Sequence, residues 1–222
     1  MLINIWNELS QYSIPEIIAV IASLSYTLLA ARENRACWPA AFIGSLIYIV
    51  VFWQYKLYMD SALNIYYAAM EVVGWFSWQA SRALSTAPMP PRTISSPIIP
   101  SPIIQWQAKQ HIQWISLVLI LSAISGYFLA KFTDAAFPYL DSFTTWASLL
   151  ATWMVVKKVL ETWLYWLVID FVSMLLYFNK GLLFTALLFA LYVVIVIYAY
   201  FNWRKIMQQD LATSTHLNLA NG

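Results

Sequence analysis

Residues 163–203, WLYWLVIDFVSMLLYFNKGLLFTALLFALYVVIVIYAYFNW, decide the fold class because this stretch is almost entirely apolar. Its only charged residues are Asp170 and Lys180. A helix needs about 20 mostly apolar residues to cross a hydrocarbon core roughly 30 Å thick, so the stretch is long enough for two spans joined by a tight turn. The sequence therefore predicts two transmembrane helices, at about residues 162–179 and 181–203.

The rest of the chain has the same apolar character. Over 222 residues, 62% are hydrophobic and only 10% are charged, whereas about a quarter of the residues of a soluble domain are charged. We therefore predict an all-α integral membrane protein with seven transmembrane helices and no soluble catalytic domain. The five further apolar segments lie at about residues 15–31, 38–55, 60–80, 112–130 and 139–156.

A proline-rich segment separates the third and fourth predicted spans. Residues 88–102 contain six of the nine prolines of the chain, and a helix does not tolerate so many missing N–H donors. The segment is expected to be a cytoplasmic linker between the first three-helix unit and the fourth span. The predicted organisation is a first unit at 1–83, the linker at 84–111, a single fourth span at 112–130, a second unit at 131–205 and a cytoplasmic tail at 206–222.

The positions of lysine and arginine predict the orientation, because short cytoplasmic loops hold most basic residues. With seven spans, nine basic residues fall on one side and three on the other, which places the N-terminus outside and the C-terminus in the cytoplasm. Lys157 and Lys158 are expected to anchor the cytoplasmic end of a span. The nine are Arg32, Arg35, Arg82, Arg92, Lys109, Lys157, Lys158, Arg204 and Lys205.

The two predicted three-helix units resemble each other in sequence. Residues 38–78 align with residues 163–203 without a gap, at an offset of 125, with tryptophans matched at both ends and Tyr67 matched to Tyr192. A single span between the units gives both the same direction in the membrane. Parallel repeats of this kind are one basis of transporter folds, with the substrate site near the midplane at the repeat interface.

Two carboxylates lie inside predicted spans, Glu71 in the third and Asp170 in the sixth. A carboxylate at the centre of a span costs about 2.5 to 3.5 kcal/mol on insertion scales, so it normally faces a polar cavity. We therefore expect both carboxylates to belong to a binding site. The alternative is that they pair with tyrosine or tryptophan donors between helices.

Aromatic and polar residues accompany both carboxylates at helical spacing. Ring faces attract cations by about 0.5 to 2 kcal/mol, and a carboxylate adds charge complementarity, so such a surface suits a flat organic cation. Trp38, Trp78 and Trp203 lie near span ends and are expected to be interfacial anchors instead. The predicted substrate-binding residues are Asn64, Tyr67, Glu71, Trp75, Trp163, Trp166 and Asp170.

Other functional classes find little support in the sequence. It contains no phosphate-binding loop and no Cys/His cluster at metal-ligand spacing, and Cys37 is its single cysteine. We expect no catalytic residues, metal, cofactor or nucleic-acid partner. Two other classes remain open: a membrane-embedded enzyme that uses the two carboxylates as acid and base, and a subunit with no pathway of its own.

Three motifs resemble the PnuC family of bacterial vitamin transporters: GWFSW at residues 74–78, WLYW at residues 163–166, and the following Asp170. The resemblance extends from about Glu16 to Trp203. It implies a full-length relative of the SWEET sugar-transporter fold in the bacterial inner membrane, with three, one and three spans, often trimeric. It also implies facilitated diffusion, with uptake maintained by a cytoplasmic kinase that phosphorylates the vitamin.

The resemblance also bears on the substrate. Family members that carry nicotinamide riboside typically have glutamine and asparagine on the third span and asparagine after the W-x-x-W pair. The matching positions here hold Asn64, Glu71 and Asp170, so two amides are replaced by acids. This pattern resembles the PnuT branch, whose substrate is thiamine. Thiamine is therefore the expected substrate, and nicotinamide riboside is the alternative.

Overall fold

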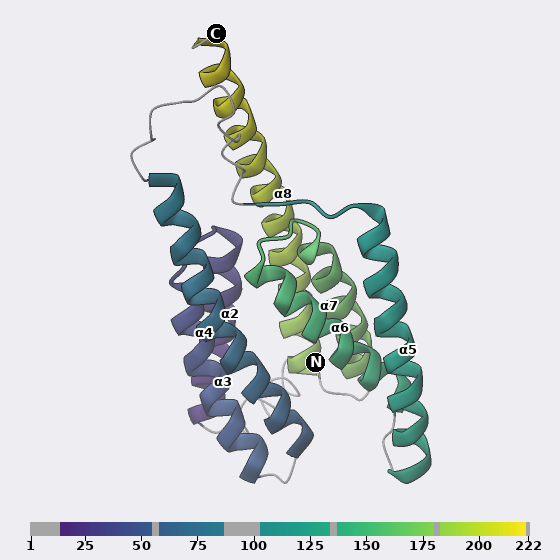
Figure 1. Cartoon of the computed structure of the whole chain (residues 1–222). Helices are drawn as coiled ribbons and strands as arrows, with labels where there is room; N and C mark the ends of the chain where they lie inside the picture. Colours follow the sequence, from purple (N-terminus) through teal and green to yellow (C-terminus); the bar gives the residue numbers. More distant parts are fainter. Residues whose placement is uncertain (1–13, 55–57, 87–102, 134–136, 180–182, 221–222) are drawn as a thin grey trace.

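The computed structural model describes residues 14–54, 58–86, 103–133, 137–179 and 183–220. In this part of the chain the protein consists of helices that run roughly along one direction (Figure 1). They are α2 (Ile14–Ala31), α3 (Cys37–Gln54), α4 (Tyr58–Thr86), α5 (Ala108–Phe132), α6 (Pro138–Val156), α7 (Thr162–Asn179) and α8 (Leu183–Ala220).

Each of the seven predicted spans corresponds to one of these helices. Among the residues that the structure describes, four segments are long and apolar enough to cross a membrane: Cys37–Gln54, Ala108–Phe132, Thr162–Asn179 and Thr185–Ala212. Two helices continue past the predicted spans, α4 from about residue 80 to Thr86 and α8 from about residue 203 to Ala220. Hydropathy locates the part of a helix that lies in hydrocarbon, and a helix can continue beyond it into water.

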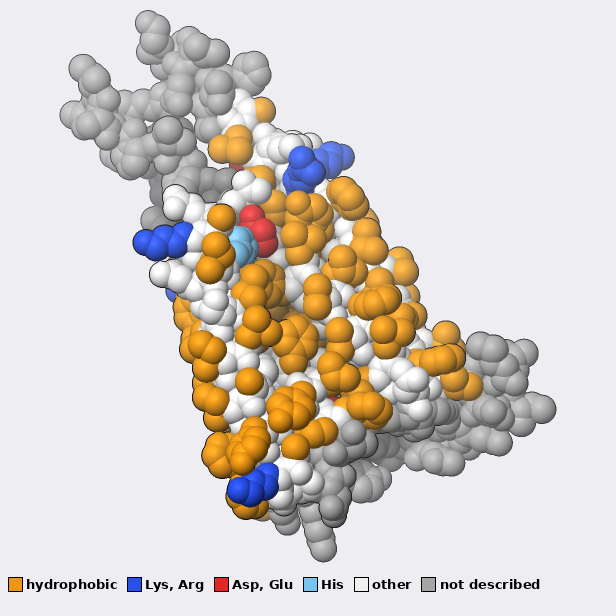
Figure 2. Space-filling model, turned by 90° about the vertical axis from the view of Figure 1, so that its right-hand side faces the viewer, with side chains coloured by type: hydrophobic (Ala, Val, Ile, Leu, Met, Phe, Trp, Pro, Cys, Tyr) orange, Lys and Arg blue, Asp and Glu red, His pale blue; other side chains and the backbone are white. Residues whose placement is uncertain are grey.

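The helices pack in two groups of three with α5 at one edge (Figure 1). Helices α2, α3 and α4 form one unit, and α6, α7 and α8 form the other; α5 packs on α6. The units meet where α2 packs on α8 and where α4 packs on α6. Figure 2 shows the α5 side as a broad apolar surface with lysine and arginine gathered toward its two ends. A surface of this kind is suited to contact with lipid.

The turns that follow α2 and α6 have the same backbone geometry. Glu33 and Lys158 both have φ of 54°, in the left-handed region. The N–H of Glu33 donates to the carbonyl of Ala30 at 2.9 Å, and the N–H of Lys158 donates to the carbonyl of Val155 at 3.0 Å. The two turns are therefore equivalent at a spacing of 125 residues, which is the offset of the sequence alignment.

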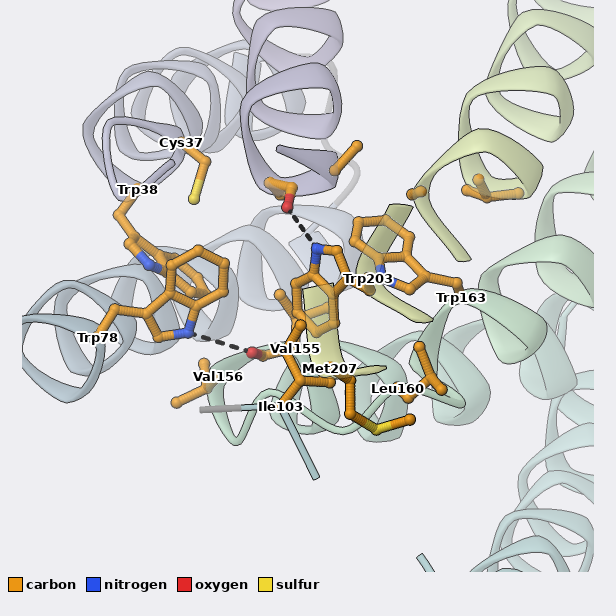
Figure 3. Packing of buried hydrophobic residues seen from close by; sticks show 14 residues of the cluster. Cys37, Trp38, Trp78, Ile103, Val155, Val156, Leu160, Trp163, Trp203 and Met207 are labelled. Carbon is orange, nitrogen blue, oxygen red and sulfur yellow. Dashed lines mark hydrogen bonds between the residues drawn. The ribbon is translucent and has the colours of Figure 1, made fainter. Parts of the chain in front are cut away.

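Two tryptophans make crossed hydrogen bonds between the units (Figure 3). The indole N–H of Trp78 on α4 donates to the carbonyl of Val155 on α6 at 3.3 Å. The indole N–H of Trp203 on α8 donates to the carbonyl of Ala30 on α2 at 2.9 Å. Each unit thus binds the equivalent carbonyl of the other, as expected for two units related by an approximate two-fold rotation.

Trp38, Trp78, Trp203 and Trp163 form a continuous line of rings that we call the tryptophan row. Successive ring centroids are 5.2, 5.9 and 5.2 Å apart, and the two outer pairs meet edge to face. All four side chains are at most 3% exposed. The prediction that three of them are interfacial anchors is therefore wrong. Their place near the ends of predicted spans indicated the depth of these residues but not that they face the other unit.

Gly74 on α4 is required by the ring of Trp38. A Cβ at Gly74 would lie 2.5 Å from ring atoms of Trp38, whereas a Cβ at Gly44 on α3 would meet its nearest neighbour, the Cβ of Ala22, at 3.4 Å. Because overpacking a buried site costs typically about 1 to 3 kcal/mol, we expect Gly74→Ala to lower the melting temperature in detergent. Gly44→Ala is the matched control and should leave it unchanged or higher. Equal melting temperatures for the two variants would contradict this packing.

Candidate functional site

Glu71 lies inside the first three-helix unit, where α4 packs on α3. Its Oε1 accepts a hydrogen bond of 2.8 Å from the hydroxyl of Ser45, and the two residues are 7% and 6% exposed. The other carboxylate oxygen, Oε2, is buried and has no hydrogen-bond partner among the described residues. Since burying a polar group without a partner is costly, this oxygen is suited to receive a donor or a cation from a ligand.

Asp170 lies on α7 in the second unit and is 5% exposed. Tyr192 of α8 interacts electrostatically with Asp170, and also with Tyr48 of α3 from the first unit. Asp170 follows Ser45 by 125 residues, so at the alignment offset the carboxylate of one unit stands where the other unit has the hydroxyl that binds Glu71.

The two carboxylates lie at a similar depth. Glu71 precedes Trp78 by seven residues, and Asp170 follows Trp163 by seven residues. Seven helical residues rise about 10 Å. Both tryptophans belong to the tryptophan row. Helix α4 reaches the row in its C-terminal part, whereas α7 begins at the row. Glu71 and Asp170 therefore lie on the same side of the row, each about 10 Å along its helix.

Each carboxylate has a tyrosine near it, Tyr26 for Glu71 and Tyr192 for Asp170. Tyr26 of α2 lies near Glu71 and Tyr67. Tyr67 and Tyr192 are themselves equivalent at the alignment offset. The surroundings of the two acids thus include aromatic side chains with hydroxyl groups, which can both pack on a flat ring and donate hydrogen bonds.

The remaining predicted residues have different surroundings. Asn64 is buried on the same helix as Glu71. Trp75 makes a cation–π contact with Arg35, whose guanidinium carbon lies 5.1 Å from the ring centroid. Trp166 packs between the hydrophobic cluster that contains the tryptophan row and a second cluster that includes Leu150 and Met154 of α6. Trp163 belongs to the tryptophan row, and its indole N–H has no acceptor among the residues described.

Sequence reasoning missed Ser45, Tyr26 and Tyr192. Ser45 could have been found because it aligns with Asp170, and Tyr192 because it aligns with Tyr67. Tyr26 gave no comparable signal, since its proximity to Glu71 arises from the packing of α2 within its unit.

Comparison with known proteins identifies the kind of protein to which this site belongs. The sequence model of a family described as nicotinamide mononucleotide transporter matches residues 13–205, which include the described parts of α2 to α7 and most of α8. The chain belongs to the PnuC family. It is accordingly a membrane transporter, as the resemblance of its motifs predicted.

Individual PnuC relatives are distant. The nicotinamide riboside transporter PnuC of Escherichia coli K12 is 20% identical over 182 residues, covering 75% of this chain and 74% of the relative. The protein of the same name from Neisseria mucosa is 21% identical over 202 residues, covering 86% and 72%. A crystal structure of the vitamin B3 transporter PnuC matches 94% of this chain and 90% of its own with a TM-score of 0.66, at 17% identity. The PnuC fold is therefore shared.

Proposed function

We propose that this PnuC protein carries thiamine across the membrane by facilitated diffusion. The observation that carries the proposal is the pair of buried carboxylates, Glu71 and Asp170, at similar depth in the two units. Both lie among aromatic side chains. A permanently cationic, flat substrate neutralises charge that hydrocarbon does not solvate, and it is also attracted to ring faces.

The acids favour thiamine over other flat cations. Thiamine has a cationic thiazolium ring and an aminopyrimidine whose exocyclic amine and, when protonated, ring nitrogen can donate paired hydrogen bonds to one carboxylate. Hydrogen bonds to an ionised group are roughly twice as strong as neutral ones. Oε2 of Glu71, which has no partner among the described residues, is a candidate acceptor for one bond of such a pair. Asn64 and Tyr67 orient polar groups, and Trp75 and Trp166 supply aromatic surface. Trp163, which the sequence placed in the binding site, is part of the buried tryptophan row that closes one end of it.

Nicotinamide riboside is the second candidate. The relatives from Escherichia coli and Neisseria mucosa are nicotinamide riboside transporters, which favours this substrate on kinship. Its amide and sugar hydroxyls suit neutral asparagine and glutamine at least as well as carboxylates. The two candidates therefore differ in what the acids at positions 71 and 170 contribute.

A paired titration of the purified protein with thiamine and nicotinamide riboside tests the substrate assignment. Binding followed by intrinsic tryptophan fluorescence is expected to give a lower Kd for thiamine. A lower Kd for nicotinamide riboside would reverse the assignment. Binding of neither vitamin would reject the proposed site.

The architecture proposed for transport is that of a full-length SWEET-like protein. The chain crosses the membrane seven times, with the N-terminus outside, and its two three-helix units are parallel repeats that rock around a central site. The equivalent turns at Glu33 and Lys158 and the crossed bonds of Trp78 and Trp203 support this arrangement. The chain works as a homotrimer, and a cytoplasmic kinase that phosphorylates the vitamin maintains net uptake.

Ser45 is proposed to position the carboxylate of Glu71 for substrate. Loss of one hydrogen bond costs about 0.5 to 1.5 kcal/mol, so Ser45→Ala should raise the Kd for thiamine about threefold to tenfold. Ser45→Thr keeps a hydroxyl and should retain most of the affinity. Titration of the two variants checks this, and an unchanged Kd in Ser45→Ala would exclude the positioning role.

A further inference from the structure

An ion pair joins the two units at equivalent positions. Nζ of Lys158 in the turn after α6 contacts Oε1 of Glu33 in the turn after α2, and the two residues are 125 apart in sequence. Their side chains are only 9% and 15% exposed. The expectation that Lys158 simply anchors a span end is therefore wrong, because the other unit supplies an acid that binds it.

The ion pair lies directly against the tryptophan row. Nζ of Lys158 is 4.9 Å from the ring centroid of Trp78, within range of a cation–π contact. Trp78 in turn donates to the carbonyl of Val155, three residues before Lys158, and Trp203 donates to that of Ala30, three residues before Glu33. Both turns are therefore bound by the last helix of the opposite unit and by each other.

The ion pair and the tryptophan row together form a layer between the two units, at the end of the helix bundle that carries the two turns. The rings of the row leave almost no exposed surface, and Figure 3 shows Trp38, Trp78, Trp203 and Trp163 side by side between the helices of both units. The carboxylates of Glu71 and Asp170 lie about 10 Å away along their helices. A substrate at the carboxylates therefore has the tryptophan row between itself and this end.

We propose that the Glu33–Lys158 pair is the latch of a gate at this end, cytoplasmic in the predicted orientation, with the tryptophan row as the barrier. The proposal rests on the proposed transport function. Moving the units apart separates the two opposite charges, and each charge then regains its hydration. The regained hydration offsets much of the lost attraction, because a buried ion pair gains little net stability over its hydrated ions. Such a contact suits a latch that must close and open repeatedly.

Cys37 provides a native reporter for this gate. It is the single cysteine of the chain, it is 0% exposed, and it begins α3 within the core cluster that contains the tryptophan row. Opening of the layer exposes its thiol to water. The rate of alkylation by a water-soluble maleimide therefore measures how often the gate opens, with no substrate present.

The test compares three variants in detergent. Glu33→Gln and Lys158→Gln are each expected to raise the alkylation rate of Cys37 at least about tenfold over the unaltered protein. The double charge swap, Glu33→Lys with Lys158→Glu, should return the rate toward that of the unaltered protein. Single variants that react no faster than the unaltered protein, at matched melting temperature, would overturn the latch.

A crosslinking experiment covers the case in which the single variants do not fold. In a Cys37→Ala background, Glu33→Cys and Lys158→Cys are joined by a short methanethiosulfonate crosslinker and reconstituted in liposomes. Crosslinking should stop flux of the vitamin that binds in the paired titration, and reduction should restore it. Full flux through crosslinked protein would overturn the gate. Because alkylation of Cys37 needs no vitamin, a wrong substrate assignment leaves the first test intact.

Discussion

Glu71→Gln and Asp170→Asn are each expected to raise the Kd for thiamine about 10-fold to 100-fold. A hydrogen bond to a charged group contributes about 1.5 to 3 kcal/mol, and every 1.4 kcal/mol is about a factor of ten in affinity. Each substitution keeps the size of the side chain but removes the charge that faces a cationic ring. Titration by tryptophan fluorescence measures both Kd values.

Asp141→Asn is the control for this loss of charge. Asp141 lies in the first turn of α6 and is not among the residues around either buried carboxylate. Its substitution should leave the Kd for thiamine unchanged. A similar Kd in the unaltered protein, Glu71→Gln and Asp170→Asn would remove both acids from the binding site.

If the two acids act on different parts of one substrate, the double variant should bind less tightly than either single variant.

Trp203→Ala is expected to cause the largest loss of stability. Its side chain is fully buried, contacts the rings of Trp78 and Trp163 and donates to the carbonyl of Ala30. Large-to-small substitution of a buried tryptophan costs about 3 to 5 kcal/mol. The contact between α2 and α8 should weaken, and the melting temperature in detergent should fall sharply.

Phe201→Ala is the matched control, because Phe201 lies on the same helix and is 61% exposed. Its substitution should change the melting temperature little. If Trp203→Ala and Phe201→Ala had the same melting temperature, the crossed hydrogen bonds would contribute little to holding the units together.

The helices were predictable because long apolar runs leave few alternatives to membrane spans. The ends of α4 and α8 were not, since the segments past residues 80 and 203 are polar enough to lie in water and hydropathy does not distinguish an aqueous helix from a loop. The burial of Glu71 and Asp170 was predictable for the same reason as the spans, because a carboxylate in hydrocarbon has few tolerable surroundings.

The contacts between helices were harder to predict. The hydrogen bond between Ser45 and Glu71 joins two helices at a distance of 26 residues, and helical periodicity gives the face of each residue but not the partner of that face. For Glu33 and Lys158 a signal was present. The alignment offset that matches the tryptophans also sets an acid against a base at these two positions, and an approximate two-fold rotation brings such positions together near its axis.

Vitamin flux into liposomes that contain only this chain tests the central claim most directly. With an external thiamine gradient and no ion gradient, internal labelled thiamine should rise above that of empty liposomes and stop when the two concentrations are equal. Glu71→Gln and Asp170→Asn should slow this rise. Flux no greater than in empty liposomes, for both thiamine and nicotinamide riboside, would contradict a carrier built around the two buried carboxylates.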